Sequence, residues 1–206
     1  RLKQRFGLLD EASAQAPILP LTEAQRVQHE QLAQDVADRS VTLVRNRRGL
    51  LPLRAQPGLR LLLVVVGPEA QAEELSRRFE PTAAALRQRG LQVALRVNLS
   101  YYEADLGQAL RDHDRFVFAF CRHPHAPIGS LQLQGSEALT VWSMQQLPPE
   151  RVLAVSYGDP AVHDQYLPRL PTAVNVYSSC AASQRALVKA LLGEMPFNGR
   201  SPVQLG

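Results

Sequence analysis

Leu61-Leu62-Leu63-Val64-Val65-Val66 is an unbroken apolar run, and Gly67-Pro68 follows it directly. A strand with one solvent-exposed face alternates apolar and polar residues, whereas this run presents apolar side chains to both faces of the sheet. It is also far shorter than the ~20 residues that a membrane-spanning helix needs. We therefore expect a strand that is buried on both faces, as in a parallel sheet covered by helices, and that ends at Gly67.

Segments of two alternating types lie on either side of this strand. Short apolar or β-branched runs predict further strands, and the segments between them have the apolar spacing of helices. The strands are expected at 41–44, 92–97, 115–120, 152–156 and 172–176, and the helices at 22–39, 69–79, 102–111, 132–146, 161–166 and 183–192. This alternation predicts an α/β fold, a three-layer α/β/α sandwich with a mostly parallel sheet. In such sheets ligands usually bind at the carboxyl ends of the strands.

The composition is that of an ordinary globular protein. The chain has 206 residues, of which 45% are hydrophobic and 20% charged, and its net charge is +4. This content suffices for one domain with a full core and a flanking segment. Nucleic-acid binding requires a one-sided basic patch with stacking aromatic residues, but the basic residues here are interleaved with acidic ones and only 6% of the chain is aromatic. We therefore expect neither a nucleic-acid partner nor a membrane span.

Cys121 and Cys180 are the two cysteines of the chain. Two cysteines without a C-x-x-C motif indicate neither a disulfide framework nor a thioredoxin-like redox site. Cys180 stands near the start of a predicted helix, a position that lowers the pKa of a thiol. Because no base lies near it in the sequence, we interpret Cys180 as a small buried residue.

Two motifs of enzyme chemistry are absent. Gly67-Pro68 lies between a predicted strand and a predicted helix, where phosphate-binding loops occur, but the sequence has neither G-x-G-x-x-G nor G-x-x-x-x-G-K-[ST]. Pro68 also lacks the backbone N–H that such a loop would use. No G-x-S-x-G nucleophile elbow occurs either. We interpret Gly67-Pro68 as a tight turn between strand and helix.

The densest group of reactive side chains is Cys121-Arg122-His123-Pro124-His125, directly after a predicted strand. In an extended chain residues 121, 123 and 125 point the same way, and Cys and His are zinc ligands. The sequence indicates no fourth ligand, so we expect no metal here. We expect Arg122, His123 and His125 to lie in a loop that contacts a partner surface or a substrate. An exposed loop without a role is the equally weighted alternative.

Asp112-His113-Asp114 lies where a predicted helix ends and a predicted strand begins. A general acid and a general base must reach a substrate held between them, and carboxylates one residue apart give no sign of that arrangement. We therefore interpret the three residues as a solvated helix end. Trp142, three residues after Leu139 within a predicted helix, is expected to pack rather than to stack on a ligand.

The order of short motifs along the chain is similar to that of one enzyme family. The motifs are Val41–Asn46, Gly49–Leu53, Leu59–Pro68, Ser183–Leu187, Leu191–Glu194, Pro196-Phe197, Gly199-Arg200 and Pro202-Val203, preceded by Arg5–Asp10. The first two match the pattern T-L-[LV]-[KR]-N followed by L-P-L. Together the motifs span nearly the whole chain and resemble the C-terminal domain of the family-three glycoside hydrolases.

This resemblance implies an α/β sandwich that packs against an N-terminal (β/α)8 barrel of the same parent protein. The barrel would hold the catalytic Asp nucleophile, and neither the barrel nor its K-H-x-P-G signature is in this chain. The resemblance thus implies a part of a retaining glycosidase with a carbohydrate substrate, no cofactor and no catalytic residue in this chain. We expect residues 1–40 to be an interdomain linker and leading helix, and residues 41–206 to be the sandwich domain. A start at Arg1, without Met, agrees with a fragment of a longer protein.

A missing carboxylate indicates the branch of the family. In the β-glucosidase relatives, the resemblance places a general acid/base Glu in a loop near residues 121–133, but no Asp or Glu occurs from Phe116 to Ser136. A group that could protonate the leaving oxygen is therefore absent where that branch needs it. The β-N-acetylhexosaminidase branch, in which an Asp–His pair of the barrel does this work, resembles the chain better. We expect a β-N-acetylglucosaminidase.

Two other interpretations stay open from the sequence. One is a stand-alone α/β module of the flavodoxin-like kind that binds a small ligand or a partner. The other is a degenerate or purely structural domain, which the missing carboxylate also permits. A barrel of about 250 residues encoded upstream of Arg5–Asp10 would favour the glycosidase.

Overall fold

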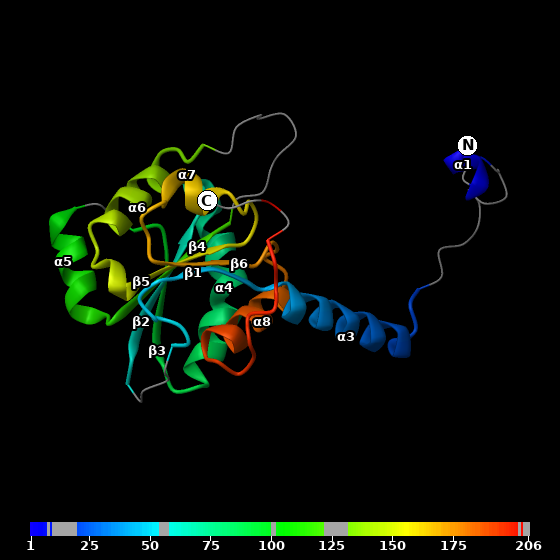
Figure 1. The fold of residues 1–206 in the computed structure, drawn as a ribbon, viewed down its shortest axis with the longest axis horizontal. Coiled ribbons are helices and arrows are strands. Elements are labelled where there is room, and N and C mark those ends of the chain that lie inside the picture. Colours follow the sequence, from blue (N-terminus) through cyan, green and yellow to red (C-terminus); the bar gives the residue numbers. More distant parts are fainter. Residues whose placement is uncertain are drawn as a thin grey trace. The chain divides into compact units, whose positions relative to one another are not determined.

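A computed structural model describes residues 1–7, 9, 20–53, 58–99, 102–121, 132–201 and 203. The chain divides into two compact units, Arg1–Leu32 and Ala33–Gly206. The second unit contains the sheet and most of the helices (Figure 1). None of the helices in the described ranges has the length and apolar character needed to cross a bilayer.

The first unit holds the short helix α1 (Leu2–Arg5) and the beginning of α3 (Glu23–Ser40). Thr22 and Gln25 form a capping box at the start of α3. The Thr22 backbone N–H donates to Gln25 Oε1 at 2.9 Å, and the Gln25 backbone N–H donates to Thr22 Oγ1 at 3.3 Å. Two N–H groups without partners in the helix are thereby satisfied. Of the α3 residues only Ala37 is buried.

The described residues form one sheet of six strands in the order β1-β6-β5-β4-β2-β3. The strands are β1 (Thr42–Asn46), β2 (Arg60–Val66), β3 (Gln92–Val97), β4 (Arg115–Phe120), β5 (Val152–Ser156) and β6 (Thr172–Asn175). All neighbours run parallel except β1, which pairs antiparallel with β6. The sheet is therefore mostly parallel, as predicted.

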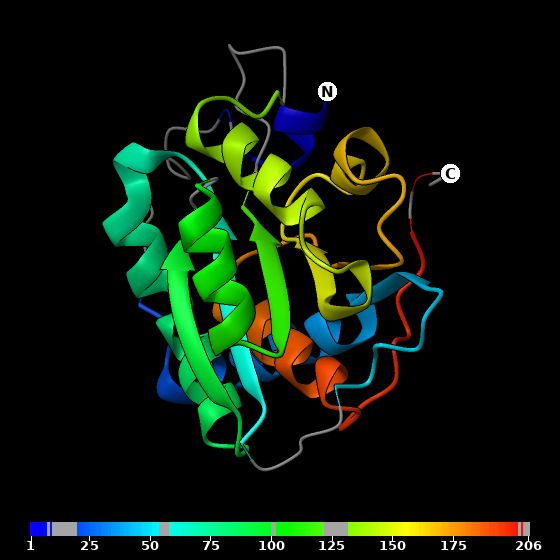
Figure 2. The same cartoon turned by 90° about the vertical axis from the view of Figure 1, so that its left-hand side faces the viewer.

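Helices cover both faces of the sheet (Figures 1 and 2). On one face lie α4 (Ala72–Arg87) and α8 (Ala181–Leu191), and on the other lie α5 (Glu103–Asp112), α6 (Ser136–Gln145) and α7 (Val162–Tyr166). Short 3-10 turns, η1 (Glu69–Gln71) and η2 (Pro149–Arg151), precede α4 and β5. The prediction of a three-layer α/β/α sandwich is confirmed.

The unbroken apolar sequence of β2 is explained by the burial of its side chains on both faces of the sheet. Leu61, Leu63 and Val65 join the core on the side of α4 and α8. Leu62, Val64 and Val66 join the core on the side of α5, α6 and α7. All six side chains are at most 2% exposed. Because each buried side chain of this size stabilises the fold by about 1.5–3 kcal/mol, neither face of β2 tolerates a polar residue.

Helix α4 differs from the prediction, which ends this helix at residue 79. In the structure α4 continues through Pro81 to Arg87. Proline removes one backbone N–H from the hydrogen-bond ladder of a helix. The helix persists because Phe79, Ala83 and Leu86 on its inner face are at most 1% exposed. Burial of that face outweighs the missing hydrogen bond.

Arg45 of β1 ties the end of α7 to the sheet. Its guanidinium donates to the carbonyl oxygens of Pro168 at 2.7 Å, His163 at 3.1 Å and Leu167 at 3.2 Å. The His163 and Leu167 carbonyls also accept the backbone N–H groups of Leu167 and Leu170, so the guanidinium adds a second hydrogen bond to each of them. His163 itself is fully buried, and its Nε2 lies 3.0 Å from the Val174 carbonyl oxygen in β6. Since a carbonyl only accepts, Nε2 carries the proton of the neutral ring.

Candidate functional site

The carboxyl ends of the parallel strands lie at one edge of the sheet, where folds of this class bind ligands. Gly67, Asn98, Cys121, Tyr157 and Val176 directly follow β2, β3, β4, β5 and β6. From β2 the chain crosses to β3, its neighbour on one side, and from β3 it crosses back to β4, the neighbour of β2 on the other side. The connections that leave β2 and β4 therefore run in opposite directions along the sheet, and folds of this class bind ligands at such a point. The carboxyl-end edge of the sheet at β2 and β4 is thus the candidate region.

Asn98 forms hydrogen bonds that connect the ends of β2 and β3 with the start of α6. Its Oδ1 accepts the Gly67 backbone N–H at 3.2 Å, and its Nδ2 donates to the Gly67 carbonyl oxygen at 2.9 Å and to Ser136 Oγ at 3.1 Å. The residue has a positive φ of 56°, a conformation that asparagine tolerates better than most residues. Asn98 thus joins the ends of β2 and β3 to the start of α6, which is a structural role.

The predicted loop residues Arg122, His123 and His125 lie outside the described residues, so their contact with a substrate or a partner stays a prediction. Within the described ranges, no group of three or more His, Cys, Asp or Glu side chains could hold a metal ion. Cys121, which precedes the loop, is described. Burial raises the pKa of its thiol to about 12, so the thiol stays protonated at neutral pH and is a poor metal ligand and nucleophile.

The interpretation of Asp112-His113-Asp114 as a solvated helix end is wrong for His113, which is buried, whereas Asp114 is partly exposed but ion-paired. His113 is 9% exposed, and its Nδ1 lies 3.1 Å from the Ala109 carbonyl oxygen. Asp114 pairs with Arg60, whose Nη2 lies 2.9 Å from Asp114 Oδ1. Hydrogen bonds from the Arg60 side chain and backbone lower the pKa of Asp114 to about 2. These residues anchor the start of β4, at the edge opposite the candidate region.

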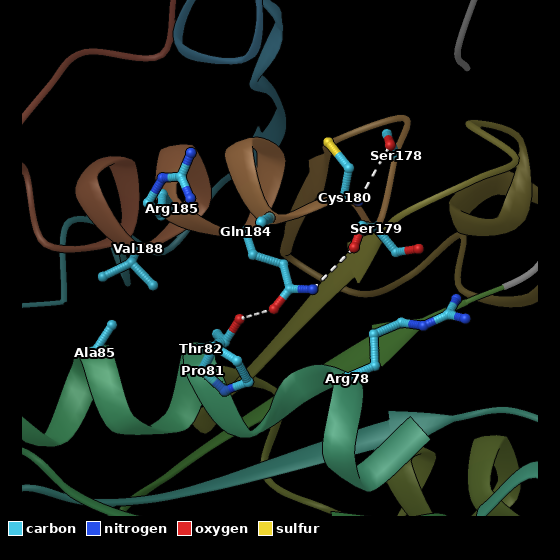
Figure 3. Close-up of a pocket in the computed structure, with 11 residues that line it drawn as sticks. Arg78, Pro81, Thr82, Ala85, Ser178, Ser179, Cys180, Gln184, Arg185 and Val188 are labelled. Atoms are coloured by element: carbon cyan, nitrogen blue, oxygen red, sulfur yellow. Dashed lines mark hydrogen bonds between the residues drawn. The ribbon is translucent and has the colours of Figure 1, made fainter. Parts of the chain in front are cut away.

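A groove of about 740 Å³ lies between α4 and α8 (Figure 3). Its lining comes from one side of each helix and from the segment before α8: Arg78, Pro81, Thr82, Ala85, Ser178, Ser179, Cys180, Ala181, Gln184, Arg185 and Val188. Figure 3 shows Thr82 and Gln184 pointing toward each other across the groove. Thr82 Oγ1 donates to Gln184 Oε1 at 2.6 Å, and Gln184 Nε2 donates to the Ser179 carbonyl oxygen at 2.8 Å. This bridge holds the two helices in register.

Cys180 lies in this groove as the N-cap residue of α8, and it is exposed. The interpretation of Cys180 as a small buried residue is therefore wrong. Partial burial acts to raise the pKa of the thiol. The Ser183 hydroxyl, whose oxygen lies 3.3 Å from the sulfur, together with the nearby Ser178 hydroxyl and the backbone N–H groups of Ser183 and Ala182, outweighs burial and lowers that pKa to about 7. A large share of Cys180 is thus thiolate, the nucleophilic form, at neutral pH.

Asp114 and Glu194 are carboxylates whose pKa values are shifted, and both are shifted downward. Hydrogen bonds from Arg89 lower the pKa of Glu194, as Arg60 lowers that of Asp114. Asp114 precedes β4 and Glu194 follows α8, so both stand away from the carboxyl ends of the strands. A general acid that protonates a leaving oxygen near neutral pH needs a raised pKa. Neither carboxylate suits that task.

Comparison with solved structures supports the fold. The β-glucoside phosphorylase BglX matches 98% of this chain and 36% of its own, at 23% identity and a TM-score of 0.72. A family-3 β-N-acetylglucosaminidase from Paenibacillus sp. str. FPU-7 matches 97% of this chain and 36% of its own, at 17% identity and a TM-score of 0.56. A fungal multi-domain family-3 β-N-acetylglucosaminidase matches 87% of this chain and 19% of its own, at 22% identity and a TM-score of 0.62.

The chain therefore has the fold of a region of family-3 glycoside hydrolases, and the predicted resemblance is confirmed at the level of the fold. It spans about a third or less of the length of these three solved structures. No family model matches the sequence, and no curated protein matches it either.

Proposed function

We propose that this chain is the C-terminal α/β domain of a retaining family-three glycoside hydrolase, a β-N-acetylglucosaminidase, whose catalytic (β/α)8 barrel lies in another part of the parent protein. The observation that carries the proposal is the fold. The chain has a six-stranded sheet, and its structure matches over 98% of its length a region that makes up 36% of the larger β-glucoside phosphorylase BglX. In this proposal residues 1–40 are the linker and leading helix, and residues 41–206 are the domain.

The chemistry of the chain supports an accessory rather than a catalytic role. Retaining hydrolysis usually needs two carboxyl groups ~5–5.5 Å apart, one as nucleophile and one as acid and base. The connection after β4 has no Asp or Glu between Phe116 and Ser136. The carboxylates with shifted pKa values, Asp114 and Glu194, are held ionised by arginines. The nucleophile and the acid/base are accordingly assigned to the barrel.

The absence of a carboxylate after β4 also supports the β-N-acetylglucosaminidase branch over the β-glucosidase branch. Two of the structures with this fold are described as family-3 β-N-acetylglucosaminidases. In this proposal the loop with Arg122, His123 and His125 forms a wall of the substrate site or part of the contact with the barrel. Histidine and arginine there supply hydrogen-bond donors to sugar hydroxyl or amide groups.

The test compares the 206-residue chain with its parent protein on an aryl β-N-acetylglucosaminide and an aryl β-glucoside. The parent is expected to hydrolyse the first substrate with retention of configuration, and the isolated chain is expected to fold and to hydrolyse neither. Turnover by the isolated chain that is lost on mutating one of its own residues would show that the active site is misplaced. A parent without a barrel would instead support the stand-alone ligand-binding module.

A further inference from the structure

We propose that the groove between α4 and α8 is a binding site for small, carboxylate-bearing disulfides, and that Cys180 captures them as mixed disulfides. The site is separate from any glycosidase chemistry, because its lining residues come from α4, from α8 and from the segment directly before α8. The inference therefore stands or falls independently of the proposed function.

The groove has the size and the charge for such a ligand. Its volume of about 740 Å³ lies in the range of sites that hold small molecules, about 300–1,000 Å³. Among the described residues, the charged side chains in its lining are Arg78 from α4 and Arg185 from α8, with no carboxylate beside them. Pro81, Ala85 and Val188 give it apolar walls. An anionic ligand with an uncharged middle part complements this lining.

The arginines retain the capacity to bind carboxylates. Arg78 pairs with Glu74 one turn earlier on α4, and both side chains are well exposed, at 41% and 55%. Exposed pairs of this kind contribute at most about 1 kcal/mol, so a ligand carboxylate can compete for the guanidinium. Arg185 donates through Nε to Gln34 Oε1 at 2.7 Å, a single neutral hydrogen bond among the five that a guanidinium can make.

Cys180 supplies the covalent step. Cys180 belongs to the residues that line the same groove, and its sulfur lies 3.3 Å from Ser183 Oγ at the start of α8. The thiolate attacks one sulfur of the bound disulfide, a new S–S bond to Cys180 forms, and the old S–S bond breaks. The other half leaves as a thiolate and takes a proton from water. The bound disulfide is the oxidant, and its released half is the reduced product.

Cys121 provides an internal control for this reaction. Its thiol is mostly buried at the end of β4 and its pKa is raised to about 12, so it reacts slowly with any disulfide. Selective labelling at Cys180 is therefore the first expectation. Selectivity for charge is the second, and the Arg77 and Arg78 variants below separate the contribution of the groove from that of the net charge of +4 on the whole chain.

The experiment measures the rate of mixed-disulfide formation at Cys180 by mass spectrometry, using the 206-residue chain. The probes are oxidised glutathione, which is anionic, hydroxyethyl disulfide, which is neutral, and cystamine, which is cationic. Each rate is divided by the rate of the same probe with free 2-mercaptoethanol at the same pH, which removes differences in intrinsic reactivity. We expect the normalised rate to be about tenfold higher for oxidised glutathione than for cystamine at low salt, and the difference to shrink as salt is added.

Two matched variants assign that preference to the groove. Arg78→Gln is expected to reduce it to about twofold, because one of the two cations is lost. Arg77→Gln changes the neighbouring residue of α4, which pairs with Glu73 and is not in the groove lining, and it should leave the preference intact. Equal normalised rates for the three probes would overturn the proposal. So would a preference that Arg77→Gln and Arg78→Gln reduce alike, or labelling at Cys121 as fast as at Cys180.

Discussion

Asp114, directly before β4, accepts hydrogen bonds from Arg60, the first residue of the neighbouring strand β2. The Arg60 backbone N–H donates to Asp114 Oδ2 at 3.0 Å, and Arg60 Nη2 donates to Asp114 Oδ1 at 2.9 Å. The side-chain and backbone hydrogen bonds lower the pKa of Asp114 from 3.8 to about 2. The aspartate therefore stabilises the folded state above its unfolded pKa, and this contribution is lost as the pH falls through about 2.

Replacement of this carboxylate is expected to change the acid sensitivity of the fold. In urea unfolding, the wild type should lose stability more steeply than Asp114→Asn between about pH 4 and pH 2, because only the wild type must protonate a stabilised carboxylate. Asp112→Asn is the matched control, since Asp112 accepts its side-chain hydrogen bond from Gln108 of the same helix, whereas Asp114 accepts hydrogen bonds from Arg60 of β2. Identical slopes for the wild type and Asp114→Asn would contradict the prediction.

His163 is expected to destabilise the fold in mild acid. Burial lowers the pKa of this ring from 6.5 to about 4, although the hydrogen bond to Val174 opposes the shift. Between these two values the unfolded chain binds a proton that the folded chain does not, so stability falls as the pH decreases from 6.5 to 4. The penalty reaches about 3 kcal/mol at its largest. His163→Gln should flatten this dependence even if it lowers stability at neutral pH, and an unchanged slope in chemical denaturation would count against it.

Gly199 is expected to tolerate no side chain. A Cβ at this position would lie 2.1 Å from the Ser40 carbonyl oxygen and 2.3 Å from Thr42 Oγ1, and the backbone oxygen cannot move aside. Gly199→Ala should therefore destabilise the fold by about 1–3 kcal/mol in thermal or urea unfolding. Gly107→Ala is the control, because its nearest neighbour is the flexible end of Arg111 at 3.3 Å. That change lies within α5 and should be neutral or stabilising by up to about 1 kcal/mol. A Gly199→Ala variant as stable as the wild type would contradict the observed packing.

In the parent protein, His123→Ala is expected to affect substrate binding more than folding. The residue is predicted to lie in a loop near the substrate, so its loss should raise KM for the aryl β-N-acetylglucosaminide severalfold while the unfolding midpoint stays unchanged. His29→Ala, on the exposed part of α3, is the control and should alter neither quantity. A lower unfolding midpoint with an unchanged KM would assign His123 a structural role instead.

The strands were the most predictable part of the fold. The predicted boundaries of β3, β4 and β5 match the structure residue for residue, because short runs of buried apolar residues leave few alternatives. Strand order and direction were less accessible, since both depend on pairing between distant segments. Nothing in the residues of β1 shows that it lies at the edge of the sheet and runs against β6.

The α4–α8 groove could be predicted only in part. The position of Cys180 before a helix suggested a lowered thiol pKa, but its exposure depends on how α8 packs beside α4. Arg78 lies far from Cys180 in the sequence, and only the tertiary fold brings both into one groove. For Trp142 the prediction overestimated burial, just as for Cys180 it underestimated exposure at the groove. Trp142 was expected to pack against its neighbours, but it is 49% exposed on α6.

The antiparallel pairing of β1 with β6 has a consequence for synthesis on the ribosome. Thr42 pairs with Asn175, so β1 leaves the exit tunnel long before its partner has been translated. The pairs between β2, β3 and β4 involve nearer segments and can form while translation continues. β1, the first strand of this sheet in chain order, must therefore wait, with its hydrogen-bonding groups unpaired, until nearly the whole domain has emerged. This delay exposes the nascent chain to aggregation and to chaperones at one defined place, the future edge of the sheet.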